Sequence, residues 1–194
     1  MDQKLEACKA ISESYSILSV ECMADLESSS ELLTFEENCM LVKEGQYCDY
    51  AFYIIKGSAR AYYLKDGKDI SDWFAFENDF ITPINTFFQN VPSPHFIELL
   101  EPSTLLQISK RNFTILSDKY HDFERFGRVV VTNTMLRLQQ RITAILFETA
   151  QQKYENVLKI WPHITQRVAL SHIASYLGIT LETLSRIRNP KNRI

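Results

Sequence analysis

Glycine is scarce in this sequence, with only five among 194 residues, at positions 45, 57, 67, 127 and 178. The interval 68–126 therefore lacks the glycines that let backbone N–H groups form a nest around a phosphate. Positive charge is also missing there, because residues 69–109 contain no lysine or arginine, a single histidine (His95) and six acids. A buried phosphate requires a cation or such a nest, so this stretch is unsuited to hold one.

Long apolar runs, clustered metal ligands and a secretory signal are absent too. No run reaches the roughly 18 apolar residues that a membrane span needs, and the N-terminal segment is polar. The four cysteines form no CxxC pair and the four histidines are scattered. A disulfide framework, an iron–sulfur or zinc site and a cupin-type metalloenzyme are therefore disfavoured. We expect a cytoplasmic protein with reduced thiols, no membrane association, no metal or cofactor, and no enzymatic activity.

The centre of the chain is rich in short β-type runs. With 45% hydrophobic residues, the chain can bury a core and is long enough for two domains. Residues 1–30 have a loose helical spacing, and seven β-rich runs follow between Leu32 and Ser109. Turn signals separate them at Gly45, Gly57 and Asp66-Gly67, the last typical of a two-residue hairpin. These features predict a small antiparallel roll or barrel.

A helical pattern begins near Lys110 and contains a heptad-like seam. Its apolar residues step by four and three positions, which predicts either a helix packed on the roll or the seam of a dimer. A shorter helix is expected over about 151–160, ending before Pro162. The seam consists of Val131, Met135, Leu138, Ile142 and Ile145.

The stretch 168–188 has the pattern of a helix-turn-helix. Ala174 is small where two short helices would cross, Gly178 suits a turn with positive φ, and Thr180 suits the N-cap of a second helix. The alternative is an ordinary helical hairpin inside a larger core, which requires only apolar residues at helical spacing. That spacing is given by Ile173, Leu177, Ile179, Leu184 and Ile187.

Charge is distributed unevenly along the chain. The segment 163–194 holds five basic residues and one acid, a charge of +4, so the rest of this −3 chain carries −7. An acidic body with a basic end is suited to attracting nucleic-acid phosphates at that end.

Three segments resemble the Crp–Fnr family of transcription regulators. They are VKEGQYCDYAFYIIKGSARAYYLKDGK, the step Gln140-Arg141-Ile142, and IASYLGITLETLSRIR. The resemblance implies an α+β fold with an N-terminal antiparallel, jelly-roll-like β-roll, a long dimerisation helix and a C-terminal helix-turn-helix. We expect a roll domain with N-terminal helices at 1–117, the long helix at 118–150 and a DNA-binding domain at 151–194. The implied function is a homodimer that binds double-stranded DNA and regulates transcription.

The chain departs from the family at the cyclic-nucleotide site. The Gly-Glu that holds the ribose in family members falls on Thr82-Pro83, and the Arg-Ser that holds the phosphate falls near Ser93-Pro94. The hydroxyls that meet the purine fall near Phe126 and Gly127. We therefore predict a degenerate pocket that does not bind cyclic AMP in the usual way and an effector of unknown identity. Aromatic residues over 73–96, beginning at Trp73, either fill the roll or line a pocket for an apolar ligand.

The resemblance also assigns roles at the DNA to the recognition helix, expected over 181–188. Glu182 and Arg186 occupy the family's base-reading positions, and their side chains can contact cytosine N4 and guanine O6/N7. Leu181, Thr183 and Ser185 are further candidates for base edges, whereas Thr180, Arg188 and Lys191 are expected at phosphates. The alternative is a ligand-sensing or partner-binding roll whose helix-turn-helix has lost its function.

Overall fold

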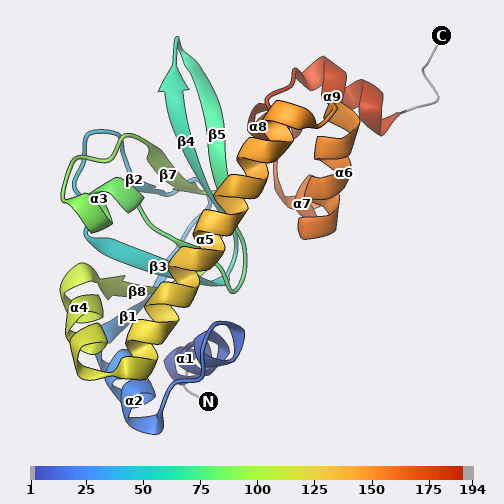
Figure 1. Cartoon of the computed structure of the whole chain (residues 1–194). Helices are drawn as coiled ribbons and strands as arrows, with labels where there is room; N and C mark the ends of the chain where they lie inside the picture. Colours follow the sequence, from blue (N-terminus) through green and yellow to red (C-terminus); the bar gives the residue numbers. More distant parts are fainter. Residues whose placement is uncertain (1–2, 190–194) are drawn as a thin grey trace.

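The computed structural model describes residues 3–189 of the chain as a β-roll, a long helix and a C-terminal helical unit (Figure 1). Two helices precede the roll, α1 (Gln3–Ser14) and α2 (Val20–Ser29). The strands are β1 (Ser30–Phe35), β2 (Met40–Val42), β3 (Tyr50–Lys56), β4 (Ala59–Lys65), β5 (Lys68–Ala75), β6 (Phe80–Ile81), β7 (Phe96–Leu99) and β8 (Ser103–Ser109).

The roll consists of two four-stranded antiparallel sheets. Their strand orders are β1-β8-β3-β6 and β2-β7-β4-β5. Buried side chains from both sheets form one core cluster, including Ile54, Ile97, Leu99 and Leu105. The predicted hairpin at Asp66-Gly67 joins β4 and β5, with φ of 53° and 74° at the two turn residues. The expected antiparallel roll is therefore present.

One short helix in the roll had no clear signal in the sequence. Helix α3 (Ile84–Gln89) follows Pro83 and ends at Asn90, which has a φ of 56°. The sequence predicted only that aromatic side chains in this segment fill the roll or line a pocket. Of these, Phe87 is buried at 3% exposure in the cluster beneath the N-terminal helices.

The helical pattern after the roll divides into two helices at Tyr120. Helix α4 (Lys110–Lys119) begins at the Ser109 N-cap, and α5 (His121–Phe147) then runs diagonally across the roll (Figure 1). The long helix is thus shorter at both ends than the expected 118–150. The N-terminal half of α5 packs with α1, α2 and α4 through Phe123 and Phe126.

Four further helices form a unit at the far end of α5 (Figure 1). They are α6 (Ala150–Ile160), α7 (Ile164–Arg167), α8 (Leu170–Leu177) and α9 (Leu181–Arg188). Their core also includes Phe74 and Phe76 of the roll. These two rings therefore do not fill the roll interior, because they pack against Trp161 and Tyr176 of the helical unit. No helix within residues 3–189 is both long and apolar enough to span a membrane.

Candidate nucleic-acid interface and its attachment to the roll

The turn between α8 and α9 has the geometry that its sequence predicts. Gly178 ends α8 with a φ of 66°, and its N–H donates to carbonyls of the last turn. Ala174 is buried at 2% exposure where the two helices meet. The Thr180 hydroxyl accepts a hydrogen bond from the Thr183 N–H at 3.2 Å and caps α9. A side-chain cap of this kind satisfies a backbone donor that would otherwise lack a partner.

Helix α9 presents most of the predicted DNA-contacting residues on one exposed face. Leu184 is fully buried at 0% exposure and anchors the helix in its unit. Thr183 is partly buried, and Lys191 lies outside the described residues. The residues exposed to solvent are Thr180, Leu181, Glu182, Ser185, Arg186 and Arg188.

Charge on this face is mixed at its start and positive at its end. The Glu182 backbone N–H and the Thr180 hydroxyl lower the pKa of the exposed Glu182 carboxyl, and Arg186 adds to the effect. Glu182 therefore stays an acceptor at neutral pH, while Arg186 and Arg188 provide cations in the last turn. The face thus combines an acceptor and two donors of the types used to contact DNA.

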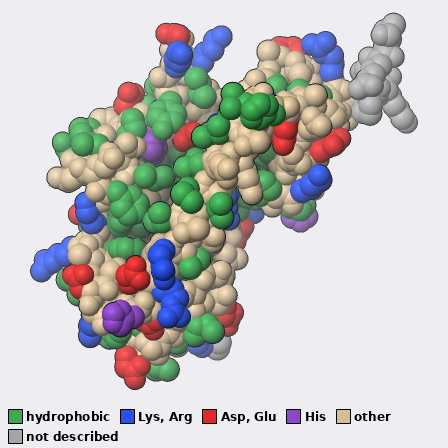
Figure 2. Space-filling view, in the orientation of Figure 1, with side chains coloured by type: hydrophobic (Ala, Val, Ile, Leu, Met, Phe, Trp, Pro, Cys, Tyr) green, Lys and Arg blue, Asp and Glu red, His purple; other side chains and the backbone are tan. Residues whose placement is uncertain are grey.

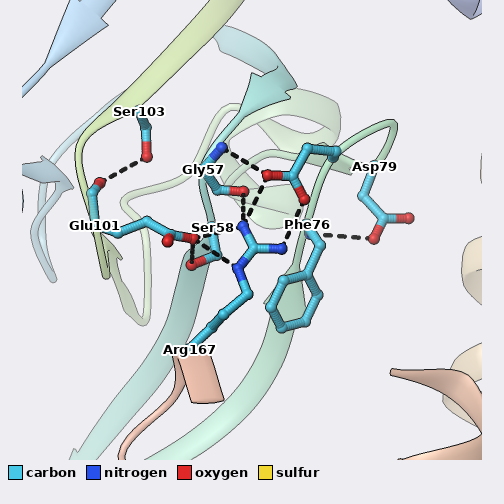
Figure 3. A network of polar contacts seen from close by, with 8 residues as sticks. Gly57, Ser58, Phe76, Asp79, Glu101, Ser103 and Arg167 are labelled. Atoms are coloured by element: carbon cyan, nitrogen blue, oxygen red, sulfur yellow. Dashed lines mark hydrogen bonds and ion pairs between the residues drawn. The ribbon is translucent and has the colours of Figure 1, made fainter. Parts of the chain in front are cut away.

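A charged clamp built on Arg167 attaches the helical unit to the roll (Figure 3). Both terminal nitrogens of Arg167 lie 2.7 Å from the Glu77 carboxylate, and its Nε lies 3.0 Å from Glu101 Oε1. Its Nη2 also donates to the Gly57 carbonyl at 3.0 Å. Burial raises the pKa of Glu77, but hydrogen bonds from Arg167 and the Gly57 N–H outweigh it and lower that pKa. The positive charge of Arg167 is therefore neutralised by the roll and adds nothing to phosphate attraction.

A second contact is built on Arg60, the buried cation of strand β4. Arg60 is 2% exposed, and its Nη2 lies 2.5 Å from Glu98 and 3.1 Å from Asp69. Its Nη1 lies 2.7 Å from Nδ1 of His172 on α8. Burial first, and then the positive charge of Arg60, lower the pKa of His172 despite the nearby carboxylates. A neutral His172 can thus accept from Arg60, which links the roll to α8.

Hydrogen bonds between the backbone of β5 and the Ser175 side chain of α8 reinforce this link. The Ser71 N–H donates to the Ser175 hydroxyl at 3.0 Å, and that hydroxyl donates to the Asp69 carbonyl at 3.1 Å. Sequence reasoning missed Arg60, His172 and this contact. No local pattern indicates them, because 112 positions of sequence separate the two side chains.

The residues expected at the cyclic-nucleotide site are engaged within the roll itself. The Thr82 hydroxyl donates to the Tyr50 carbonyl at 2.9 Å, and the buried Ser93 hydroxyl donates to the His95 carbonyl at 2.8 Å. Pro83 precedes α3, and Pro94 is exposed. In both dipeptides the side-chain hydroxyl is therefore already bonded to a backbone carbonyl of the roll.

The region aligned with the purine is filled by aromatic rings. Phe126 is 2% exposed and contacts the rings of Tyr15, Phe80 and Phe113. A Cβ added at Gly127 would lie 3.0 Å from the Phe113 ring. Trp73 lies elsewhere, in a cleft beside α5 that Thr82, Pro83, Ser93 and Pro94 do not line. Trp73 therefore does not share this cleft with the other four residues expected at the degenerate pocket.

The predicted seam forms an exposed apolar stripe on α5. Val131, Met135, Ile142 and Ile145 are between 47% and 60% exposed, and Leu138 is partly buried. Leu146 and Phe147 extend the apolar surface at the end of the helix, where hydrophobic side chains gather in Figure 2. An apolar stripe of this length on a single chain is typical of an interface.

Comparison with known proteins agrees with this architecture. Residues 32–120 match the family model of the cyclic nucleotide-binding domain. FixK2 from Bradyrhizobium japonicum is similar in structure, with 17% identity, a TM-score of 0.68 and 83% of each chain covered. The c-di-GMP-responsive global regulator CLP from Xanthomonas campestris has 13% identity and a TM-score of 0.70, with 89% of this chain and 91% of that chain covered.

The catabolite activator protein of Thermus thermophilus shares the fold as well. It has 12% identity and a TM-score of 0.58, with 93% of this chain and 85% of that chain covered. No curated protein sequence matches the chain. The fold is therefore that of Crp/Fnr-type regulators, built around a domain of the cyclic nucleotide-binding type.

Proposed function

We propose that this chain is a cytoplasmic, dimeric transcription regulator that reads the major groove of DNA with α9. The observation that supports this most strongly is the exposed face of α9, which carries Glu182 and Arg186 above a buried Leu184. A recognition helix must present side chains outward from a rigid support, and this helix does so. The α8–α9 pair is then a helix-turn-helix, with α8 as its supporting helix.

Dimer formation belongs to the same proposal. One module of this size contacts only a short stretch of DNA, so readers of this kind pair across two half-sites about one helical turn apart. The apolar stripe of α5 is the surface that would pair, since it is exposed in the single chain. The two-fold axis would then place one α9 at each half-site.

Cyclic AMP is not the effector in this proposal. Thr82 and Ser93 are bonded to backbone carbonyls, and Phe126 occupies the region aligned with the purine. Arg60 is already paired with Glu98 and Asp69. A buried cyclic phosphate would need a free cation or a set of N–H donors. Micromolar binding of cyclic AMP in calorimetry would overturn this part.

Substitution of Arg186 tests the DNA contact. Genomic fragments retained by the protein are selected, and their binding is compared with that of random DNA by fluorescence anisotropy. Arg186→Ala is expected to weaken binding to the selected fragments by about 1–3 kcal/mol and to relax selectivity at one base pair. Arg111→Ala, at an exposed arginine of α4 remote from α9, should leave both affinities unchanged.

Two results would contradict the proposal. An equal loss on selected and random DNA would show that Arg186 does not read a base. The absence of any retention on random DNA at low salt, where non-specific binding is strongest, would favour a sensing or partner-binding module instead. A functional reader should be retained and then released by about 0.3 M salt.

A further inference from the structure

A cleft opens where α5 meets the C-terminal helical unit. Its volume is about 560 Å³, and it is lined by the second half of α5 together with α6, β5 and the end of α8. Both tryptophans of the chain, Trp73 and Trp161, form its walls with Phe74 and Tyr176. Volumes of about 300–1,000 Å³ with mainly apolar walls are typical of small-molecule sites.

Cations and carboxylates around the cleft leave a small positive excess. Arg141 is paired with Asp72 at 2.5 Å, and Arg137 with Asp79 at 2.7 Å. Of the remaining charged residues in the lining, Lys153 and Lys159 are basic and Glu148 is acidic, which leaves one positive charge. The cleft therefore suits a ligand with a single negative charge.

Two of these cations converge on the last turn of α8. The Arg141 Nη2 lies 3.5 Å from the Tyr176 carbonyl, and the Lys153 Nζ lies 3.5 Å from the Leu177 carbonyl. Both contacts are at the limit of hydrogen bonding, and among the described residues Lys153 has no carboxylate partner. The Lys153 ammonium therefore remains available to a stronger acceptor, whereas Arg141 Nη2 is also held by the Ser71 carbonyl at 3.1 Å.

Arg141 is also incompletely satisfied. Its Nε is buried and has no hydrogen-bond partner among the described residues, although Nη1 and Nη2 contact Asp72 and the Ser71 carbonyl. A buried donor without a partner is uncommon in folded proteins and costs free energy. A carboxylate approaching this guanidinium would supply the acceptor that it lacks after a small shift of the side chain.

We propose that this cleft binds a small organic monocarboxylate with an apolar body. The carboxylate lies between Arg141 and Lys153, and the apolar body lies against Trp73 and Trp161. Because both cations touch the last turn of α8, an anion that attracts them acts on the helix that supports α9. The cleft is then the effector site of the proposed regulator, and only this second part depends on the proposed DNA binding.

Intrinsic fluorescence offers a selective measurement, since both tryptophans line the cleft. The full-length protein is titrated with 4-phenylbutyrate, with 4-phenylbutyramide as the neutral counterpart. We expect a saturable change in tryptophan fluorescence with the acid. The amide should bind at least about tenfold more weakly, because it cannot make the charge-assisted hydrogen bonds. Two single variants should each weaken binding of the acid by a similar factor. Lys153→Met removes the cation, and Ala144→Phe fills the cleft from α5.

Lys43→Met is the matched control for the loss of a lysine, since Lys43 is outside the cleft and should leave the titration unchanged. Circular dichroism confirms that each variant is folded. The site is refuted by the absence of a saturable change up to about 10 mM acid. It is equally refuted by equal affinities for the acid and the amide, or by an unchanged affinity of Ala144→Phe for the acid, which would place the bound acid outside the cleft.

The effector role is tested by measuring DNA affinity with and without saturating 4-phenylbutyrate. We expect affinity for the selected fragments to change at least about threefold, within the usual range of allosteric coupling. An unchanged affinity with bound acid would refute the effector role while leaving DNA binding intact. Failure of DNA binding itself would be seen without any ligand, so the two failures are distinguishable.

Discussion

At the scale of single residues, arginines and a histidine determine how the helical unit is held. Arg141 and Arg167 join α5 and α7 to the roll through carboxylates of β5 and of the loops after β5 and β7. Arg60 of β4 pairs with carboxylates of the roll itself and reaches α8 through His172. The sequence shows the acids over 69–109 clearly, but it does not show that distant arginines neutralise them. Pairing between residues that are far apart in sequence depends on the completed fold, which explains why these contacts were missed.

Loss of the Arg167 clamp should loosen the helical unit. Arg167→Met leaves Glu77 and Glu101 without their cation and also removes the contact of the guanidinium with the Phe76 ring. Because these side chains are 25–36% exposed, solvent moderates the effect, and we expect a loss of about 1–2 kcal/mol in the free energy of unfolding. Urea denaturation measures it. Arg111→Met is the control, and equal stability of the two variants would contradict a structural role for the clamp.

His172 should make stability depend on pH. Its pKa is lowered in the folded state from an ordinary value of 6.5, so the unfolded chain takes up the proton first as the pH falls. The histidine therefore favours unfolding progressively below about pH 6.5 until the folded pKa is passed. Stability rises with pH through this window.

His172→Asn keeps an acceptor near the Nδ1 position but cannot titrate. We expect thermal unfolding of the variant to be less sensitive to pH between about 5 and 7 than that of the unaltered protein. His95, whose pKa burial also lowers, contributes to both proteins and cancels in the comparison. Parallel pH profiles would show that the contact with Arg60 does not select the neutral form of His172.

At the scale of elements, the sequence predicts best the turns and helix ends that are determined by neighbouring residues. The Asp66-Gly67 hairpin, the Thr180 cap and the bounds of α9 all follow from residues that act on their immediate neighbours. Helix α3 was missed because its six residues, INTFFQ, mix polar and apolar side chains and no side chain caps its start. The break between α4 and α5 was missed because the apolar pattern continues through Tyr120, whose hydroxyl is held by Asp25.

The turn at Gly178 is the element whose substitution is simplest to interpret. A Cβ there meets nothing within 4 Å, so a side chain is disfavoured only by the positive φ of 66°. Gly178→Ala should lower the free energy of unfolding by about 1–2 kcal/mol, and Gly178→Asn by less, because asparagine tolerates this conformation better. Chemical denaturation of both variants measures the difference, and an alanine variant as stable as the asparagine one would disprove the explanation.

At the scale of the whole molecule, the candidate site was predicted in outline but not in its connections. The apolar stripe of α5 was predicted from periodicity, which reports the apolar face of a helix, whereas the residues on the exposed face of α9 were assigned from the family resemblance. The docking of α8 on β5 and the cleft beside α5 result from packing among elements far apart in sequence. Trp73 illustrates this limit, since it packs against the roll core and also lines a cleft whose other walls come from α5 and α6.

Dimerisation is the property on which the proposed DNA binding depends at this scale. Ile142→Glu places a charge in the middle of the apolar stripe, where Ile142 is 59% exposed in the single chain. The folded chain should tolerate it, but a paired stripe would have to bury two carboxylates, so the dimer should dissociate in analytical ultracentrifugation. Thr132→Glu, an equally charged change beside the stripe, is the control. If Ile142→Glu stays dimeric, or becomes monomeric while binding paired half-sites with undiminished affinity, then α5 is not the surface that brings two recognition helices together.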